Sequence, residues 1–212
     1  MKKNDIQKQN ALSNLLFPLL LVLIIGAIYL RTLLPGIGYM GDTAKFQFIG
    51  KVLGTPHAPG YPTYIILNHL FVTIFPFGTL AYKANLLSSI FTITAAIILY
   101  FTFQQIKVRP FISFLIVLTF SFGKTVWNQS IIAEVYTLNL LFLSLVTFFF
   151  LKWHFSRRDI HFYLGCLFYA LSFGNHFIMI SMLPALVYLV PLPIKEHSYL
   201  QKKSYWFCSL SV

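Results

Sequence analysis

Acidic residues are the scarcest charged class in this sequence. Asp and Glu together number 5 among 212 residues, against 16 Lys and Arg, and the four types make up only 10% of the chain. Soluble domains carry about a quarter charged residues, so this chain has too little polar surface to coat a water-soluble globule. Its 58% hydrophobic content indicates a membrane protein and excludes a soluble domain.

The chain also lacks the motifs of soluble catalytic and metal sites. Its 2 cysteines, Cys166 and Cys208, form neither a disulfide framework nor a metal-ligand cluster. No glycine-rich phosphate loop, zinc-type His/Cys spacing or nucleophile elbow is present. We expect no cofactor, and the ligand spacing gives a divalent metal ion no support.

The net charge of +11 follows from where the basic residues lie. Lys and Arg occur in short clusters between apolar runs, a pattern that orients membrane helices and does not indicate a nucleic-acid-binding surface. These clusters lie within residues 2–8, 107–109, 152–158 and 195–203. The expected partner is therefore the lipid bilayer, and no nucleic acid is expected.

The apolar runs predict an all-α fold, a multi-pass transmembrane helical bundle with about six spans. Single spans are expected at Leu15–Leu34, Ala84–Phe103, Phe111–Val126 and Val135–Leu151, and a tight hairpin of two crossings over Phe162–Val190. The hairpin should turn near the Gly174-Asn175-His176 sequence. Because the first run has no small-residue cleavage site, we interpret it as an uncleaved signal-anchor.

One apolar run, Tyr64–Phe75, is too short to cross a bilayer, since a crossing helix needs about 20 residues. We expect it to form an interfacial or re-entrant helix. All four basic clusters then lie on the side of the N-terminus, which the positive-inside rule makes cytoplasmic. A crossing helix here would move the clusters at 107–109 and 152–158 to the outside.

The expected organisation has three parts: a cytoplasmic tail over 1–14, a membrane domain over 15–192 and a basic tail over 193–212. The first outer loop of the membrane domain is expected over 35–82, carrying interfacial or re-entrant helices. The end of the chain resembles an interrupted reading frame, so we expect the basic tail to be truncated.

This topology gathers rare polar residues at the outer face. Asp42 lies just after the first span, at the N-cap of an amphipathic helix expected over Thr43–Leu53. Glu134 stands at the head of the span that begins at Val135, where a carboxylate is costly and usually functional. Each acid has a structural alternative: Asp42 as a helix cap, and Glu134 as a cap or a partner of Lys124.

Two histidines share that face. His57 lies in the turn at 56–62, Pro-His-Ala-Pro-Gly-Tyr-Pro, where the prolines restrict the backbone. His176 follows Gly174-Asn175 within apolar sequence, where polar groups need a reason. For each histidine, a role in a site and a role in the scaffold both remain open.

These residues carry a resemblance to a known family. In chain order they are Gly41-Asp42, HAPGYP at 57–62, YKANLLSS at 82–89, Trp127, AEVY at 133–136 and GNH at 174–176. They resemble a family, formerly of unknown function, that includes the vertebrate transmembrane protein O-mannosyltransferase acting on plexins and related receptors. More distantly, the chain looks like the GT-C superfamily of multi-pass glycosyltransferases, which use lipid-phosphate sugars. Family members usually have Pro where Ala58 stands, and GT-C enzymes generally carry more spans.

The resemblance implies a glycosyltransferase that moves a sugar, mannose being the leading guess, from a polyprenyl-phosphate donor to a hydroxyl of a protein or glycan acceptor at the outer face. An attacking hydroxyl needs a carboxylate base within reach, and Asp42 is the candidate catalytic residue. The candidate substrate-binding residues are His57, Tyr61, Glu134, Tyr136, Asn175 and His176. The candidate phosphate-binding residues are Lys45, Lys51, Lys83 and Lys124.

Two alternatives remain. A membrane transporter or lipid flippase would also place acids in a bundle, but it predicts charges near the mid-membrane and paired repeats, which this sequence does not show. An inactive truncated fragment is the other. As for location, we expect a multi-pass integral membrane protein with a cytoplasmic N-terminus, in a bacterial cytoplasmic membrane in preference to the endoplasmic reticulum.

Overall fold

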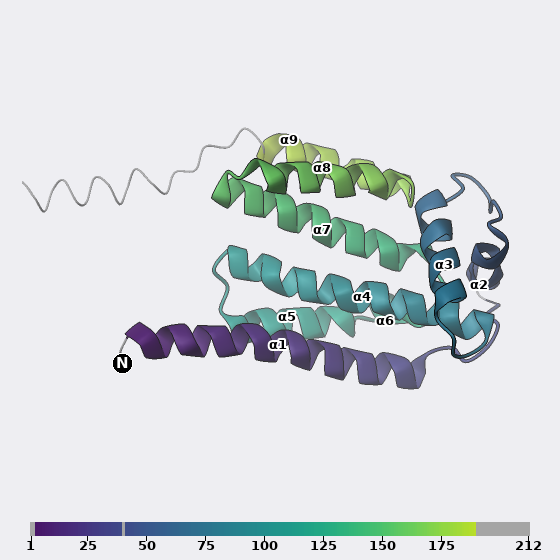
Figure 1. The fold of residues 1–212 in the computed structure, drawn as a ribbon, viewed down its shortest axis with the longest axis horizontal. Coiled ribbons are helices and arrows are strands. Elements are labelled where there is room, and N and C mark those ends of the chain that lie inside the picture. The colour runs from purple at the N-terminus through teal and green to yellow at the C-terminus, as the bar shows by residue number, and fades with distance from the viewer. Residues whose placement is uncertain (1–2, 40, 190–212) are drawn as a thin grey trace, which may run out of the picture.

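The computed structural model describes residues 3–39 and 41–189, and within them the only regular elements are helices (Figure 1). These are α1 (Lys3–Thr32), α2 (Thr43–Val52), α3 (Pro62–Ile74), α4 (Leu80–Gln105), α5 (Pro110–Ser121), α6 (Lys124–Ser130), α7 (Val135–Ser156), α8 (Asp159–Phe173), the 3-10 helix η1 (Phe177–Met182) and α9 (Leu183–Leu189). The all-α class is confirmed. The predicted basic tail over 193–212 lies outside the described residues.

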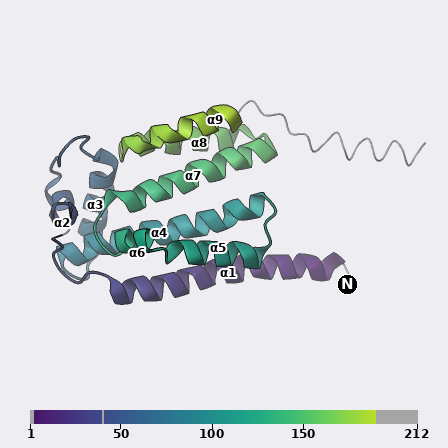
Figure 2. The same ribbon diagram turned by 180° about the vertical axis from the view of Figure 1, so that it is seen from behind.

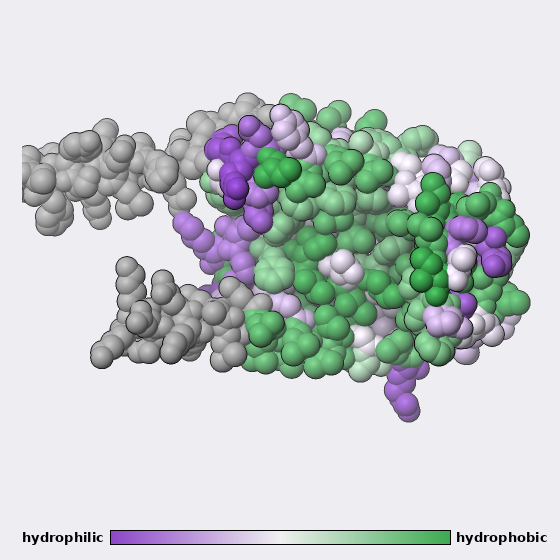
Figure 3. All heavy atoms as spheres, viewed as in Figure 1, coloured by the Kyte–Doolittle hydropathy of each residue, from purple (hydrophilic) through white to green (hydrophobic). Residues whose placement is uncertain are grey.

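The long helices form an apolar bundle in which α4 packs against both α1 and α7. Figure 3 shows a hydrophobic band along the bundle, with hydrophilic residues gathered toward its two ends. Among the described residues, 3 helices are long and apolar enough to cross a membrane, or 4 if α5 and α6 together make one span. The remaining predicted crossings fall on α8 and η1–α9, which are shorter, so the count of about six stays a prediction.

The span predicted over Phe111–Val126 is not one continuous helix. It is broken into α5 and α6, which are bent by 69° to each other. Gly123 is the N-cap of the second piece, and the buried Tyr29 hydroxyl donates a 2.6 Å hydrogen bond to the carbonyl of Ser121. A helix end leaves carbonyls without intrahelical partners, and Tyr29 supplies one of the missing donors.

Helices α2 and α3 close one end of the bundle. Figures 1 and 2 show both lying beyond the ends of the long helices, with α3 running across them. This is the arrangement predicted for a short helix that does not cross. Phe46 and Ile49 of α2 are buried against Tyr61 and Tyr64 at the start of α3. Helix α2 ends at Val52, one residue before the predicted end at Leu53, because Leu53 adopts a left-handed conformation, with φ of 49°.

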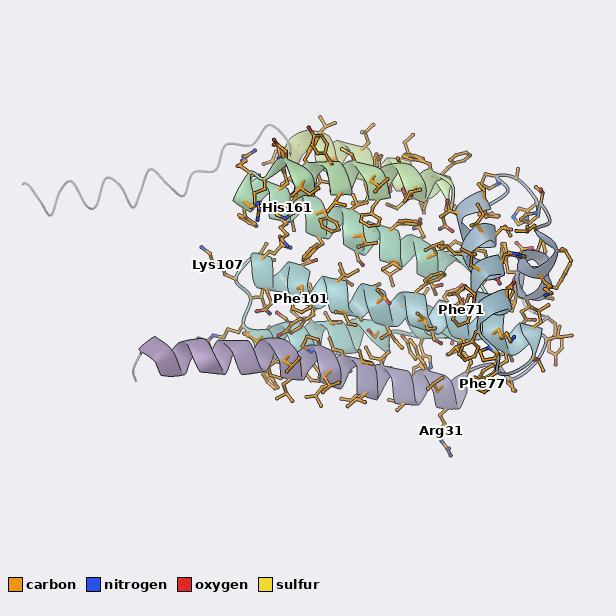
Figure 4. All side chains as sticks on the ribbon, viewed as in Figure 1. Arg31, Phe71, Phe77, Phe101, Lys107 and His161 are labelled. Atoms are coloured by element: carbon orange, nitrogen blue, oxygen red, sulfur yellow. The ribbon has the colours of Figure 1, made fainter. Side chains whose placement is uncertain are left out.

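The connections between helices lie at the two ends of the bundle. The start of α1, the α4–α5 turn with Lys107 and the α7–α8 turn lie at one end, whereas α2, α3, the α6–α7 link and the α8–η1 turn lie at the other (Figures 1 and 4). The chain reverses after α8 at Gly174, as predicted for the hairpin. Arg31 points away from the bundle at the α2–α3 end (Figure 4), where Lys45, Lys51, Lys83 and Lys124 also lie. Which end faces the cytoplasm stays a prediction.

Candidate functional site

The carboxylate of Asp42 forms a cluster with Lys45 and His57. Asp42 occupies the N-cap position of α2, but its side chain makes no capping hydrogen bond. Its Oδ1 instead accepts a 2.7 Å hydrogen bond from Lys45 Nζ, and its Oδ2 lies 3.6 Å from His57 Nε2. The hydrogen bond from Lys45 holds the pKa of Asp42 below its usual value. Asp42 is therefore an ionised, partly exposed carboxylate, and the helix-cap alternative is not what its side chain does.

The tautomer of His57 follows from its neighbours. Lys45 Nζ lies 3.3 Å from His57 Nδ1, and an ammonium group can only donate. Nδ1 is therefore the acceptor, and the ring proton of a neutral His57 sits on Nε2. That nitrogen faces Tyr61 Oη at 3.1 Å and the second oxygen of Asp42, so His57 joins the carboxylate to an aromatic side chain.

The turn that carries His57 is tightly folded. The amide of Gly60 donates a 3.0 Å hydrogen bond to the carbonyl of His57, and Gly60 has φ of 90°, which favours glycine. Thr63, at the start of α3, binds the end of α8: its amide donates to Gly174 O at 2.9 Å and its hydroxyl to Leu171 O at 3.1 Å. These two bonds attach the turn to the C-terminal end of α8, which lies more than 100 residues later in the sequence.

Glu134 lies in the link between α6 and α7 and is only 7% exposed. Its Oε1 accepts a 3.3 Å hydrogen bond from Thr43, and its amide donates to Ser88 Oγ at 3.3 Å. Burial, with a further contribution from the charge of Asp42, raises the pKa of Glu134 to about 7. Within the described chain Glu134 has no ion-pair partner, Lys124 included, and its carboxyl makes no capping bond.

An aromatic group extends the cluster toward α7 and η1. The ring of His176 lies 6.0 Å from that of Tyr61 and 5.8 Å from that of Tyr136. His176 Nδ1 accepts from the amide of Ile178 at 3.1 Å, which fixes the ring. Tyr136 is 50% exposed, so one side of this group is open to a ligand.

The remaining candidates are less directly placed. Asn175 is fully buried and donates to the carbonyl of Val135 at 3.1 Å, so it ties the α8–η1 turn to α7. Lys83 donates to Val72 O at 3.2 Å, near the end of α3. Lys51 and Lys124 are exposed and make none of the hydrogen bonds or ion pairs of the Asp42 cluster. Of the four lysines, only Lys45 contacts that cluster.

Some residues around the site were not expected from the sequence. Thr43 and Ser88 hold Glu134, and the buried amides of Gln47 and Asn85 bind each other. One feature of the sequence could have indicated Asn85: it is a polar residue in an apolar helix, and a buried amide needs hydrogen-bond partners. No group of three or more His, Cys, Asp or Glu residues among those described could hold a metal ion.

Comparisons with known proteins identify relatives of this chain. The model of the protein O-mannosyl-transferase TMEM260 N-terminal domain matches residues 42–198. The mouse (Mus musculus) protein O-mannosyl-transferase TMEM260 is 40% identical over 81 residues, covering 37% of this chain and 11% of the mouse protein. The matched region is thus a small part of that relative's length. No solved structure matches the chain.

Proposed function

Because the chain belongs to the family of the protein O-mannosyl-transferase TMEM260 N-terminal domain, we propose that it forms the catalytic-loop region of a membrane glycosyltransferase. The proposed reaction moves a sugar, with mannose as the first candidate, from a polyprenyl-phosphate donor to a protein or glycan hydroxyl at the outer membrane face. The carrying observation is the cluster in which Asp42, Lys45 and His57 meet beside the buried Glu134.

Transfer exchanges one bond at the anomeric carbon for another. The acceptor oxygen forms a bond to that carbon, the bond to the donor's phosphate oxygen breaks, and the hydroxyl proton passes to a base. Asp42 suits the base because it is ionised and 39% exposed. Glu134 suits a different role, since a carboxyl with a pKa near 7 is partly protonated at neutral pH, and the protonated form of a carboxyl is a hydrogen-bond donor. Two carboxyl groups with separated pKa values are typical of acid–base sites.

Lys45 is the proposed phosphate ligand. A leaving phosphate needs a cation or N–H donors close by, and Lys45 is the lysine that lies on the cluster. In the structure its ammonium group binds Asp42. When it turns to the phosphate, the carboxylate loses the hydrogen bond that lowers its pKa and becomes a stronger base. Donor binding thereby activates the base.

The surrounding residues have proposed binding roles. The aromatic group of Tyr61, Tyr136 and His176 offers ring faces and polar edges to a sugar or acceptor, and His57 orients Asp42. The apolar bundle accommodates the prenyl chain; one apolar cavity of about 450 Å³ lies between residues 35–37, one side of α2 and the start of α4. Lys51, Lys83 and Lys124 remain weaker phosphate candidates, because none contacts Asp42.

The orientation in the membrane is part of the proposal. The cluster end of the bundle is placed outside, and the N-terminus and the turns at 107–109 and 157–158 are placed in the cytoplasm. The mouse relative is eukaryotic, so the earlier preference for a bacterial membrane over the endoplasmic reticulum receives no support from it. Multi-pass insertion likewise stays a proposal.

The direct test is sugar transfer in membranes. Membranes containing the full-length protein are incubated with radiolabelled polyprenyl-phosphate mannose and a hydroxyl-bearing acceptor peptide, with a nucleotide-mannose donor as the comparison. We expect label on the acceptor from the lipid donor alone. Transfer no greater than in membranes without the protein, across a panel of lipid-phosphate sugars, would refute the proposed function.

A further inference from the structure

Two buried amides form a junction beneath the carboxyl groups. Gln47 on α2 is 3% exposed and Asn85 on α4 is fully buried. Gln47 Nε2 donates a 3.0 Å hydrogen bond to Asn85 Oδ1. The binding and proton-transfer roles proposed above use neither residue, although Asn85 lies in the YKANLLSS sequence at 82–89.

The pair also binds backbone from two other segments. Gln47 accepts from the amide of Gly38 at 3.1 Å and donates to the carbonyl of Gly36 at 3.1 Å. Asn85 donates to the carbonyl of Leu34 at 2.8 Å and accepts from the amide of Ala133 at 2.8 Å. The junction therefore links the segment that leads to Asp42 with the residue directly before Glu134.

The chemistry of the junction requires amides. Gln47 and Asn85 each present an acceptor and a donor together, and every one of these groups has a partner. An apolar replacement would leave backbone N–H and C=O groups buried without hydrogen bonds, which is unfavourable. Those N–H and C=O groups belong to irregular backbone, so no hydrogen bonds within a helix replace the ones that the amides supply.

We propose that Gln47 and Asn85 are positioning residues, which set the placement of Glu134 relative to Asp42 by clamping the backbone before each of them. The clamp acts from four segments at once: residues 34–38, α2, α4 and the α6–α7 link. Helix α4 also holds Glu134 directly: the hydroxyl of Ser88, one turn after Asn85, accepts a hydrogen bond from the amide of Glu134. The proposal rests on the proposed function for its effect on catalysis, but not for its effect on Glu134.

Asn68 provides a matched control. It is also a fully buried asparagine in the same part of the molecule, on α3, and donates a 2.9 Å hydrogen bond to the carbonyl of Phe46. It makes no hydrogen bond to the residues beside Glu134 or to the 34–38 segment. Asn68→Leu and Asn85→Leu therefore remove the same buried group, and only the second opens the clamp.

The first measurement is turnover per folded molecule in the full-length protein. Because a shift of about 1 Å in a reacting group costs on the order of 100-fold in rate, we expect Asn85→Leu to lower kcat by about that factor, with a smaller change in donor KM. Gln47→Met, which leaves the Asn85 to Ala133 bond in place, should lower kcat less. Asn68→Leu should stay within about threefold of the parent in kcat, whatever it does to yield.

The second measurement does not depend on activity. Dicyclohexylcarbodiimide modifies protonated carboxyl groups in apolar surroundings, so the pH at which Glu134 labelling is half-maximal reports its protonation. The parent and Asn68→Leu should give a midpoint near pH 7, the pKa of Glu134 being about 7. In Asn85→Leu, release of Glu134 toward water should lower the midpoint by about one unit or more. Gln47→Met, which keeps the bond from Ala133 to Asn85, should lower it by less.

The outcomes separate the two proposals. If the parent transfers no sugar but Asn85→Leu shifts the labelling midpoint, the proposed function fails and the clamp stands. If kcat and the midpoint of both Gln47→Met and Asn85→Leu match those of Asn68→Leu, the clamp is refuted, and the two amides serve only stability. Should Asn85→Leu not fold, Gln47→Met alone decides by the same comparison.

Discussion

The hydroxyl of Thr43 donates a hydrogen bond to the carboxyl of Glu134 across 91 positions of sequence. Thr43 is the first residue of α2 and follows Asp42 directly, so this bond draws the two acids of the bundle end together. Their environments differ: one is ionised beside Lys45, and the other is buried with a raised pKa. This contrast is the basis of the first three predictions.

Asp42→Asn should abolish most transfer without unfolding the protein. Loss of a general base typically costs about 100- to 10,000-fold in rate, whereas the Asp42 side chain makes no capping bond that Asn would lose. Turnover at matched protein levels is the measurement. Asp159→Asn, which changes an acid in the first turn of α8, at the other end of the bundle, is the control. Retention of more than a few per cent of activity by Asp42→Asn would show that Asp42 is not the general base.

Lys45→Met should move the acid limb of the pH–rate profile. Lys45 holds the pKa of Asp42 down, so its removal raises that pKa and the carboxylate protonates at a higher pH. The limb of kcat/KM should therefore shift to higher pH, and donor KM should rise because a phosphate ligand is lost. Lys152→Met, a change at the opposite end of the bundle, should leave both quantities unchanged. An unshifted limb would show that Asp42 is not the titrating base.

Glu134→Gln should flatten the pH dependence of stability. The folded pKa of Glu134, about 7, lies above its usual value of 4.5, so the folded state binds more protons than the unfolded state between these values. Stability contributed by this group is therefore fully present below about pH 4.5 and is lost as pH rises through 7. Gln mimics the protonated form at every pH. Melting temperatures in detergent from pH 5 to 8 should fall for the parent and fall less for the variant; parallel curves would contradict the raised pKa.

Gly50→Ala should weaken the packing of α2 on α3. A Cβ at this position would lie 2.7 Å from two side-chain atoms of Asn68, which is fully buried and hydrogen-bonded. Overpacking costs about 1–3 kcal/mol, which exceeds the gain of up to about 1 kcal/mol from replacing helical glycine by alanine. Gly36→Ala, where nothing lies within 4 Å, is the matched control. Equal melting temperatures for the two variants would mean that Asn68 moves aside.

Much of the fold was predictable because it depends on length and charge. Tyr64–Phe75 was too short to cross, and the structure places α3 across the bundle end. The reversal near Gly174 followed from a polar break in an apolar run. The bend between α5 and α6 was not predicted, because the Tyr29 hydroxyl that supports it comes from a distant helix.

Part of the candidate site could also be predicted from the sequence, and part could not. Rare acids and histidines in apolar sequence led to Asp42, His57, Glu134 and His176, which the structure brings to one end through contacts of their own or of Tyr61 and Thr43. The individual roles of Lys51, Lys83 and Lys124 could not be separated, since charge alone does not fix where a long side chain points. Gln47 and Asn85 were missed because their pairing depends on three-dimensional proximity.

The bond between Thr63 and the carbonyl of Leu171 spans 108 positions of sequence, which sets an order on biosynthesis. At about 5–20 residues per second, the ribosome needs roughly 5 to 20 seconds after making Thr63 before its partner exists. During that interval the turn of His57 and the first carboxylate are already synthesised, whereas Glu134 and then His176 are still to be made. The group of Asp42, Glu134 and His176 is therefore completed late, only once the turn after α8 has been made. A nascent chain stalled before α8 carries both carboxyl groups without the ring of His176 or the carbonyl that Thr63 binds.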